Sequence, residues 1–223
     1  MPQIWYYYNT RSRTLYLSNR QVNDKYKQLT FDSEITKRWN GYFIPPWYYP
    51  IENVQTVGDT FVLPEYPPAL LFGAKNLKTI NVAKWDVSNV KSLSHMFDGC
   101  EALEEIVGID TWNTSNVVNM NSMFNKCKSL TELNIPLFSI SKVVNFIEMF
   151  KNCESLESIK THNWWDNIKS RIDAGADILG DNAFLGCVKL PNYGHRDDDL
   201  FTTPLYEGIG MAKPSSEGGR FDD

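Results

Sequence analysis

Several features that mark catalytic or nucleic-acid-binding proteins are scarce or missing in this sequence. It has three histidines, His95, His162 and His195, which are too few and too scattered to form a metal cage. Lys and Arg number 22 against 27 Asp and Glu, and the basic stripe that neutralises nucleic-acid phosphates is missing. The phosphate-loop, G-x-S-x-G and H-E-x-x-H motifs are absent as well. We therefore expect no nucleic-acid partner, no catalysis, no cofactor and no metal ion.

Segments that direct a chain to a membrane are also missing. No apolar run approaches the roughly 18 residues that a membrane-spanning helix needs. The first eight residues, MPQIWYYY, lack the basic and apolar regions and the cleavage site of a signal peptide. We expect no membrane insertion. The chain is expected in the cytoplasm or in a virion if it is complete, and on the cell surface if a leader has been removed.

Closely spaced cysteine pairs of the C-x-x-C type do not occur, and the four cysteines instead mark an internal repeat. The segments share the frame F-x-x-C-x-x-L and start at intervals of 27, 26 and 34 residues: MFDGCEALEEI at 96–106, MFNKCKSLTEL at 123–133, MFKNCESLESI at 149–159 and AFLGCVKL at 183–190. A degenerate copy, FGAKNLKTI at 72–80, has Ala in place of Cys. A period of about 20–50 residues indicates stacked structural units. We predict that the cysteines are small buried residues, with a disulfide or metal site as the alternative.

Each full repeat begins with an aromatic corner, WDVSNV at 85–90, WNTSNV at 112–117 and FSISKV at 138–143. Ser88, Ser115 and Ser141 stand where a helix N-cap is expected. Apolar residues then recur every three or four positions, which predicts a short helix with one buried face. These residues are Val90, Leu93, Met96 and Phe97, then Val117, Met120, Met123 and Phe124, and then Val143, Phe146, Met149 and Phe150.

A short strand is predicted to complete each repeat, because Leu and Ile residues follow an L-x-x-L-x-L rhythm. Neighbouring side chains of a strand point to opposite faces, so the intervening residues should form one exposed sheet face. We predict this face as the binding surface; it comprises Thr79, Asn81, Glu105, Val107, Glu132, Asn134, Ser158 and Lys160.

The ends of the chain do not share the repeat. Residues 1–69 are predicted to form an aromatic, β-rich cap that includes a hairpin of residues 4–8 and 14–17. The cluster Trp47, Tyr48 and Tyr49 is a second candidate site, an aromatic patch for stacking on sugars or on a proline-rich peptide. Residues 70–192 are assigned to the repeats and residues 193–223 to an irregular C-terminal tail, which a partner chain could order.

Residues 168–181 insert about eight residues before the last repeat, and such insertions usually form loops on one face. Asp173, Asp177 and Asp181 recur there at intervals of four. A solvated acidic face is favoured over a calcium site, because the alternate-residue ligands and closing Glu of a calcium loop are missing.

The combination of W-D-V-S-N-V, M-F-x-G-C-x-x-L and A-F-x-G-C-x-x-L resembles the BspA-type leucine-rich repeat family, including its DUF285-like branch, over residues 70–190. The resemblance implies an α/β leucine-rich-repeat solenoid with a strand and a short helix in each turn of about 26 residues. It also implies adhesion or protein binding on bacterial surfaces, in some parasites and in some phage-encoded proteins.

We therefore predict a non-enzymatic module that binds a protein or a glycan. The expected partners are proteins, in a multi-chain assembly or as a cell-surface ligand. The alternative is a phage virion component, associated with the head or tail and docked through its termini. The sequence does not distinguish between the sheet face, the 160–185 insertion and the termini as the binding region.

Overall fold

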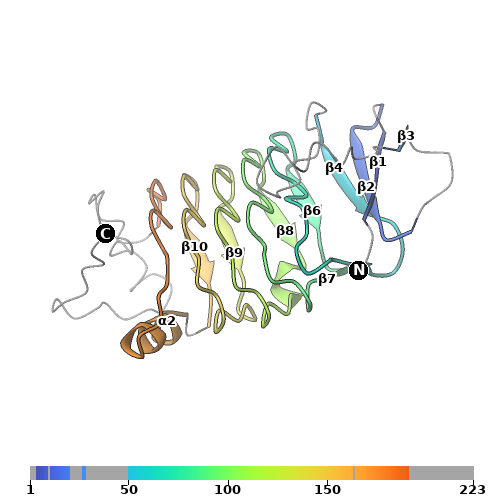
Figure 1. Cartoon of the computed structure of the whole chain (residues 1–223). Helices are drawn as coiled ribbons and strands as arrows, with labels where there is room; N and C mark the ends of the chain where they lie inside the picture. The colour runs from blue at the N-terminus through green and yellow to red at the C-terminus, as the bar shows by residue number, and fades with distance from the viewer. Residues whose placement is uncertain (1–3, 10, 21–26, 29–49, 163, 191–223) are drawn as a thin grey trace, which may run out of the picture.

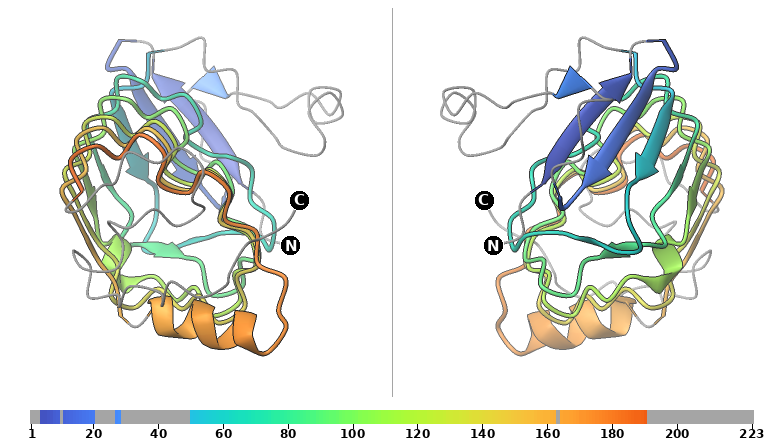
Figure 2. Two further views of the ribbon diagram at one scale, coloured as in Figure 1. Left: turned by 90° about the vertical axis from the view of Figure 1, so that its left-hand side faces the viewer. Right: turned by 90° about the vertical axis from the view of Figure 1, so that its right-hand side faces the viewer.

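The computed structural model describes residues 4–9, 11–20, 27–28, 50–162 and 164–190. The predicted aromatic patch Trp47, Tyr48 and Tyr49 and the C-terminal tail lie outside these residues. Within them, the repeats lie side by side in a row, with a small sheet at the N-terminal end (Figure 1). Viewed along the row, successive repeats follow nearly the same outline (Figure 2).

The N-terminal sheet has four strands in the order β3-β1-β2-β4. They are β1 (Trp5–Asn9), β2 (Thr14–Ser18), β3 (Lys27–Gln28) and β4 (Asn53–Thr56). β1 and β2 pair antiparallel, which confirms the predicted hairpin. The Asn9 side chain closes its turn by accepting the N–H groups of Arg11 and Ser12. Leu15 and Leu17 are buried in the same apolar core as the repeats, so this sheet packs against the first repeat.

Strands in the repeats are short and pair in parallel. The pairs are β5 (Phe61–Val62) with β7 (Trp85–Asp86), β6 (Thr79–Asn81) with β8 (Glu105–Val107), and β9 (Glu132–Asn134) with β10 (Ser158–Lys160). A 3-10 helix, η1 (Ile109–Thr111), follows β8, and an α-helix, α2 (Trp164–Asp173), follows β10.

The predicted fold class is wrong. A leucine-rich-repeat solenoid of the expected kind would have a helix in every turn and one continuous sheet along the repeats. The described residues contain a single α-helix, α2, and the strands of the repeats form separate two-stranded sheets. In the described part of the chain, only β10 is followed by an α-helix, so the strand-plus-helix unit on which that assignment rested does not recur from repeat to repeat.

Successive tight turns replace the predicted helices. In residues 95–100, alternate amides bond three residues back, as Met96 N does to Leu93 O at 3.2 Å, while the others cross to the next repeat. Phe97 N, for example, donates to Met123 O at 2.9 Å. His95 and Gly99 adopt positive φ angles of 57° and 76°, which an α-helix does not tolerate. The apolar residues still face inward, because turns of three to four residues repeat the spacing of a helical face.

The predicted N-cap serines accordingly have no helix to cap. The N–H of Ser88 donates to the Asp86 side chain at 2.9 Å, and that of Ser115 to the Asn113 side chain at 3.1 Å. Each is a local turn in which the side chain two residues earlier accepts the bond. The third serine, Ser141, shares a hydrogen bond with the Ser139 hydroxyl.

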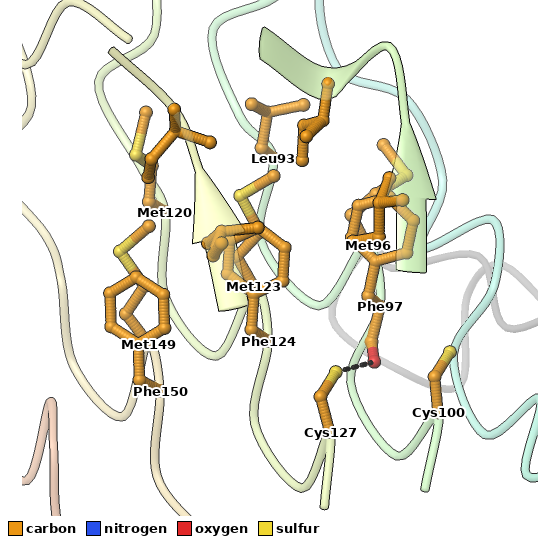
Figure 3. Packing of buried hydrophobic residues seen from close by; sticks show 14 of the residues in the cluster. Leu93, Met96, Phe97, Cys100, Met120, Met123, Phe124, Cys127, Met149 and Phe150 are labelled. Carbon is orange, nitrogen blue, oxygen red and sulfur yellow. Dashed lines mark hydrogen bonds between the residues drawn. The ribbon is translucent and has the colours of Figure 1, made fainter. Parts of the chain in front are cut away.

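Equivalent side chains of successive repeats stack in columns through the core. Phe97, Phe124, Phe150 and Phe184 form one column, with ring centroids 5.5, 5.4 and 5.0 Å apart; Figure 3 shows part of it beside the methionines. Stacked, offset rings add to the stabilisation that burial gives.

The predicted burial of the cysteines is confirmed, and all four are free thiols. Each Sγ also donates to a backbone carbonyl of the preceding repeat, as Cys127 does to Phe97 O at 3.3 Å (Figure 3). A cysteine side chain thus fills a small apolar space and also donates a hydrogen bond to a buried carbonyl. An alanine in the same place cannot donate that hydrogen bond.

The first part of the predicted insertion, residues 168–173, belongs to α2, whereas residues 174–181 form neither a helix nor a strand. Trp164 Nε1 donates to Phe138 O at 2.9 Å, and Arg171 Nη1 donates to Ile140 O at 2.8 Å, so both ends of α2 are fixed to the preceding repeat. Asp173 pairs with Lys169 one turn earlier. No helix in the described part of the chain has the length and apolar character needed to cross a bilayer.

Candidate binding surface

The predicted surface residues lie on β6, β8, β9 and β10. The middle residue of each strand, Ile80, Ile106, Leu133 or Ile159, is buried. Seven of the eight flanking residues are exposed, and Ser158 is half-buried. The alternation in the sequence therefore identified the outward positions correctly.

The registers bring these residues together in two groups. Thr79 lies opposite Glu105 and Asn81 opposite Val107 across β6 and β8. Glu132 lies opposite Ser158, and Asn134 opposite Lys160, across β9 and β10. β8 and β9 do not pair in the described structure, so the single continuous face that we expected is divided in two. We call the boundary between β8 and β9 the seam.

The seam coincides with one additional residue after β8. Ile80 is followed by Trp85 and Leu133 by Phe138, five residues on in each case, whereas Ile106 is followed by Trp112, six residues on. The additional residue lies in the corner that begins at Gly108 and continues into η1. The equivalent corners after β6 and after β9 each donate a backbone hydrogen bond to the next repeat: Val82 N donates to Val107 O, and Ile135 N donates to Lys160 O. The residue count of this one corner is the sequence signal that reveals the seam.

Most charged side chains beside these strands pair with one another across repeats. The Glu101 carboxylate lies 3.0 Å from Lys128 Nζ and 3.4 Å from Lys75 Nζ. Hydrogen bonding to Lys128, the largest effect, and to Lys75 lowers the pKa of the Glu101 carboxyl. The other pairs are Lys78 with Glu104, Glu132 with Lys160, and Glu157 with Lys189. These charges are largely neutralised within the chain.

β8 differs from the other strands at this surface. Glu105 forms no ion pair with any described residue, although Glu104 and Glu132 beside it are paired. Val107 is 41 % exposed, one of the few large apolar side chains open to solvent in the described part of the chain. A carboxylate without a counter-ion and an apolar side chain thus lie together beside the seam. An unpaired carboxylate beside an exposed apolar side chain can offer a partner both a charged and an apolar contact.

A second polar cluster, which was not anticipated, lies in the turns of residues 95–98 and 125 and not on these strands. Asp98 is buried; its Oδ2 lies 2.8 Å from His95 Nδ1, and its Oδ1 accepts the Asn125 side-chain amide at 3.0 Å. The cluster joins two neighbouring repeats. Among the described residues, no group of three His, Cys, Asp or Glu side chains is arranged to hold a metal ion.

The comparison with protein families gives a match over the repeats. The model of DUF285, described as a Mycoplasma protein of unknown function, matches residues 69–180, which is 112 of the 223 residues. The chain belongs to the DUF285 family. The DUF285 match includes all four strands of the candidate surface. No match was found among the curated proteins or among the solved structures. The DUF285 description assigns no activity or ligand, and nothing in the match favours a virion component.

Proposed function

We propose that this chain is a non-enzymatic module that binds a protein or a glycan through the outward faces of β6, β8, β9 and β10, with β8 at the centre. The observation that carries this proposal is the pair Glu105 and Val107, an unpaired carboxylate and an exposed apolar side chain on a surface whose other charges are mostly paired. The resemblance to BspA-type proteins adds adhesion at a cell surface as a setting for such binding.

The rigid packing beneath the four strands suits a binding surface. Backbone hydrogen bonds between repeats, and packing of the inward side chains in the buried columns, hold each strand in place. Its outward side chains therefore start from defined positions, and little conformational entropy is lost on binding. Inward positions repeat the same residue types, such as Ile80, Ile106 and Ile159. Outward positions change from repeat to repeat, as from Thr79 to Glu105. The surface therefore varies in chemistry over a constant scaffold.

A photo-reactive residue placed at Val107 tests the proposal in the full chain. Val144 is the matched control, because it is the same residue type, is 43 % exposed, and lies beside the Asn119–Asn145 bridge rather than on β8. After irradiation with extracellular proteins or glycans, or on intact cells, the Val107 position should give a discrete cross-linked product that the Val144 position does not give. Equal labelling from both positions would contradict the proposal.

The affinity for the partner so identified should then depend on β8. Replacing both Glu105→Gln and Val107→Thr should weaken binding at least tenfold, as expected for residues at the centre of an interface. Exchanging the paired charges of α2, Lys169→Asp with Asp173→Lys, keeps an ion pair away from these strands and serves as the control. Unchanged affinity after Glu105, Glu132 and Lys160 are all replaced by Ala would reject this surface.

A further inference from the structure

The seam between β8 and β9 interrupts a pattern of backbone hydrogen bonds that continues on either side of it. At the junctions before and after the seam, an amide donates to the preceding repeat: Glu104 N to Lys78 O at 2.7 Å, and Glu157 N to Thr131 O at 2.8 Å. The corresponding bond at the seam, from Thr131 N to Glu104 O, does not form. The Glu104 carbonyl and the Thr131 N–H therefore lack partners among the described residues.

The other end of the seam is open in the same way. Val107 O and Lys160 O each accept a hydrogen bond from the corner of the preceding repeat, whereas Asn134 O, in the equivalent position, accepts none from a described residue. The corner that would supply this donor begins at Gly108, which packs against Ala83 instead: a Cβ built on Gly108 would lie 2.5 Å from Ala83 Cβ. The Gly108 N–H finds no acceptor among the described residues either. Asn134 is exposed, so a partner can reach this end of the seam.

The lysines beside β8 do not balance the charge of Glu105. Lys78 pairs with Glu104 and Lys128 with Glu101, across the junctions on the two sides of β8. Glu105 is exposed and forms no ion pair with any described residue. β8 thus presents a carboxylate next to the open Glu104 carbonyl, and both groups are acceptors. Charge complementarity favours a cationic donor at this place.

We propose that the seam holds an arginine side chain of a partner protein, an inference that rests on the proposed function and narrows the partner to a protein. A guanidinium group carries five N–H donors in a planar fork, so it can donate to the Glu105 carboxylate and to the Glu104 carbonyl together. Its aliphatic stem can pack on Val107, which is 41 % exposed. Carbonyl groups of the partner's backbone can accept from the N–H groups of Gly108 and Thr131. A neutral glycan would leave the Glu105 carboxylate without a counter-ion.

Chemical-shift mapping by NMR on the full chain tests this inference with two blocked peptides as probes. One peptide alternates leucine with arginine, and the other alternates leucine with citrulline, which keeps the shape of arginine but carries no charge. The arginine peptide should shift the amide signals of Glu105, Val107, Gly108 and Thr131, and it should bind at least tenfold more tightly than the citrulline peptide. The amide signals of α2 should stay unchanged, which shows that the shifts are local.

Glu105→Gln should remove most of this preference for arginine. Glu157→Gln is the matched control, because it removes an equal charge beside β10, away from the seam, and should keep the preference. Equal affinity for the two peptides, no binding of either, or a preference that survives Glu105→Gln would overturn the inference.

Cross-linking from the Val107 position separates failure of this inference from failure of the proposed function. A discrete product in which this position is joined to a glycan, or to a protein segment without arginine, would overturn the inference and leave the binding surface in place. Equal labelling from the Val107 and Val144 positions would contradict the binding surface itself, and this inference with it.

Discussion

Replacing Gly108 by Ala should destabilise the protein more than its backbone conformation alone explains. Gly108 has φ +83°, and a Cβ built on it would lie 2.5 Å from Ala83 Cβ and 2.6 Å from Ala83 Cα. Carbon atoms pack best at about 3.5–4.0 Å, so the corner between β8 and η1 would have to move by roughly 1 Å. The left-handed backbone adds about 1–2 kcal/mol and overpacking about 1–3 kcal/mol, offset by about 0.4–1 kcal/mol from the restricted unfolded chain. We expect a net loss of about 1–4 kcal/mol.

Gly175→Ala isolates the packing contribution. Gly175 has nearly the same φ, +85°, but no atom lies within 4 Å of a Cβ built there. Urea denaturation should therefore show Gly108→Ala to be less stable than Gly175→Ala by about 1–3 kcal/mol, with similar m values. Equal losses for the two variants would refute the argument that close contact between repeats at Ala83 requires a glycine.

Three further predictions concern the core, the thiols and a surface ion pair. Phe124→Ala removes a fully buried ring of the stacked column and should lower the free energy of unfolding by about 3–5 kcal/mol. Leu137→Ala, at a side chain that is 66 % exposed, should change the free energy of unfolding by less than about 0.5 kcal/mol. Similar losses from the two variants would contradict the core assignment. Burial raises the pKa of the Cys127 thiol, so above about pH 8.5 the folded state retains a proton that the unfolded state releases. Stability should therefore fall with rising pH more steeply in the wild type than in Cys127→Ala, and parallel slopes in urea denaturation would argue against a buried thiol. Glu101→Gln should lose less than about 1 kcal/mol at low salt. Because the pKa of Glu101 is lowered in the folded state, this stabilisation is present above pH about 4.3 and is lost as pH falls through the folded pKa; a difference that persists at pH 2 would contradict the assignment.

The burial pattern of the repeats could be predicted from the sequence, but their local conformation could not. Val90, Leu93, Met96 and Phe97 are all buried as expected. Their spacing fits an α-helix and a series of tight turns equally well, because both return to the same side every three to four residues. Gly99 gave no signal against a helix, because it follows the last predicted helical residue, Phe97, and a glycine with positive φ is also common just after a helix ends.

The candidate surface was predictable residue by residue but not as a whole. Alternation identifies outward side chains within one strand, whereas the pairing of strands depends on how neighbouring repeats align. One additional residue after Ile106 was enough to separate β8 from β9. The ion pairs that neutralise this surface join residues 26–32 positions apart, such as Glu132 with Lys160 and Glu157 with Lys189, so they become visible only when the repeats are placed side by side.

The most direct test of the structure that supports this surface is an NMR measurement of couplings through hydrogen bonds. The account predicts a coupling between the amide nitrogen of Phe97 and the carbonyl carbon of Met123 in the next repeat, because Phe97 N donates to Met123 O at 2.9 Å. A coupling from Phe97 to the carbonyl carbon of Leu93, four residues earlier, would indicate a helix in each repeat and would contradict the account.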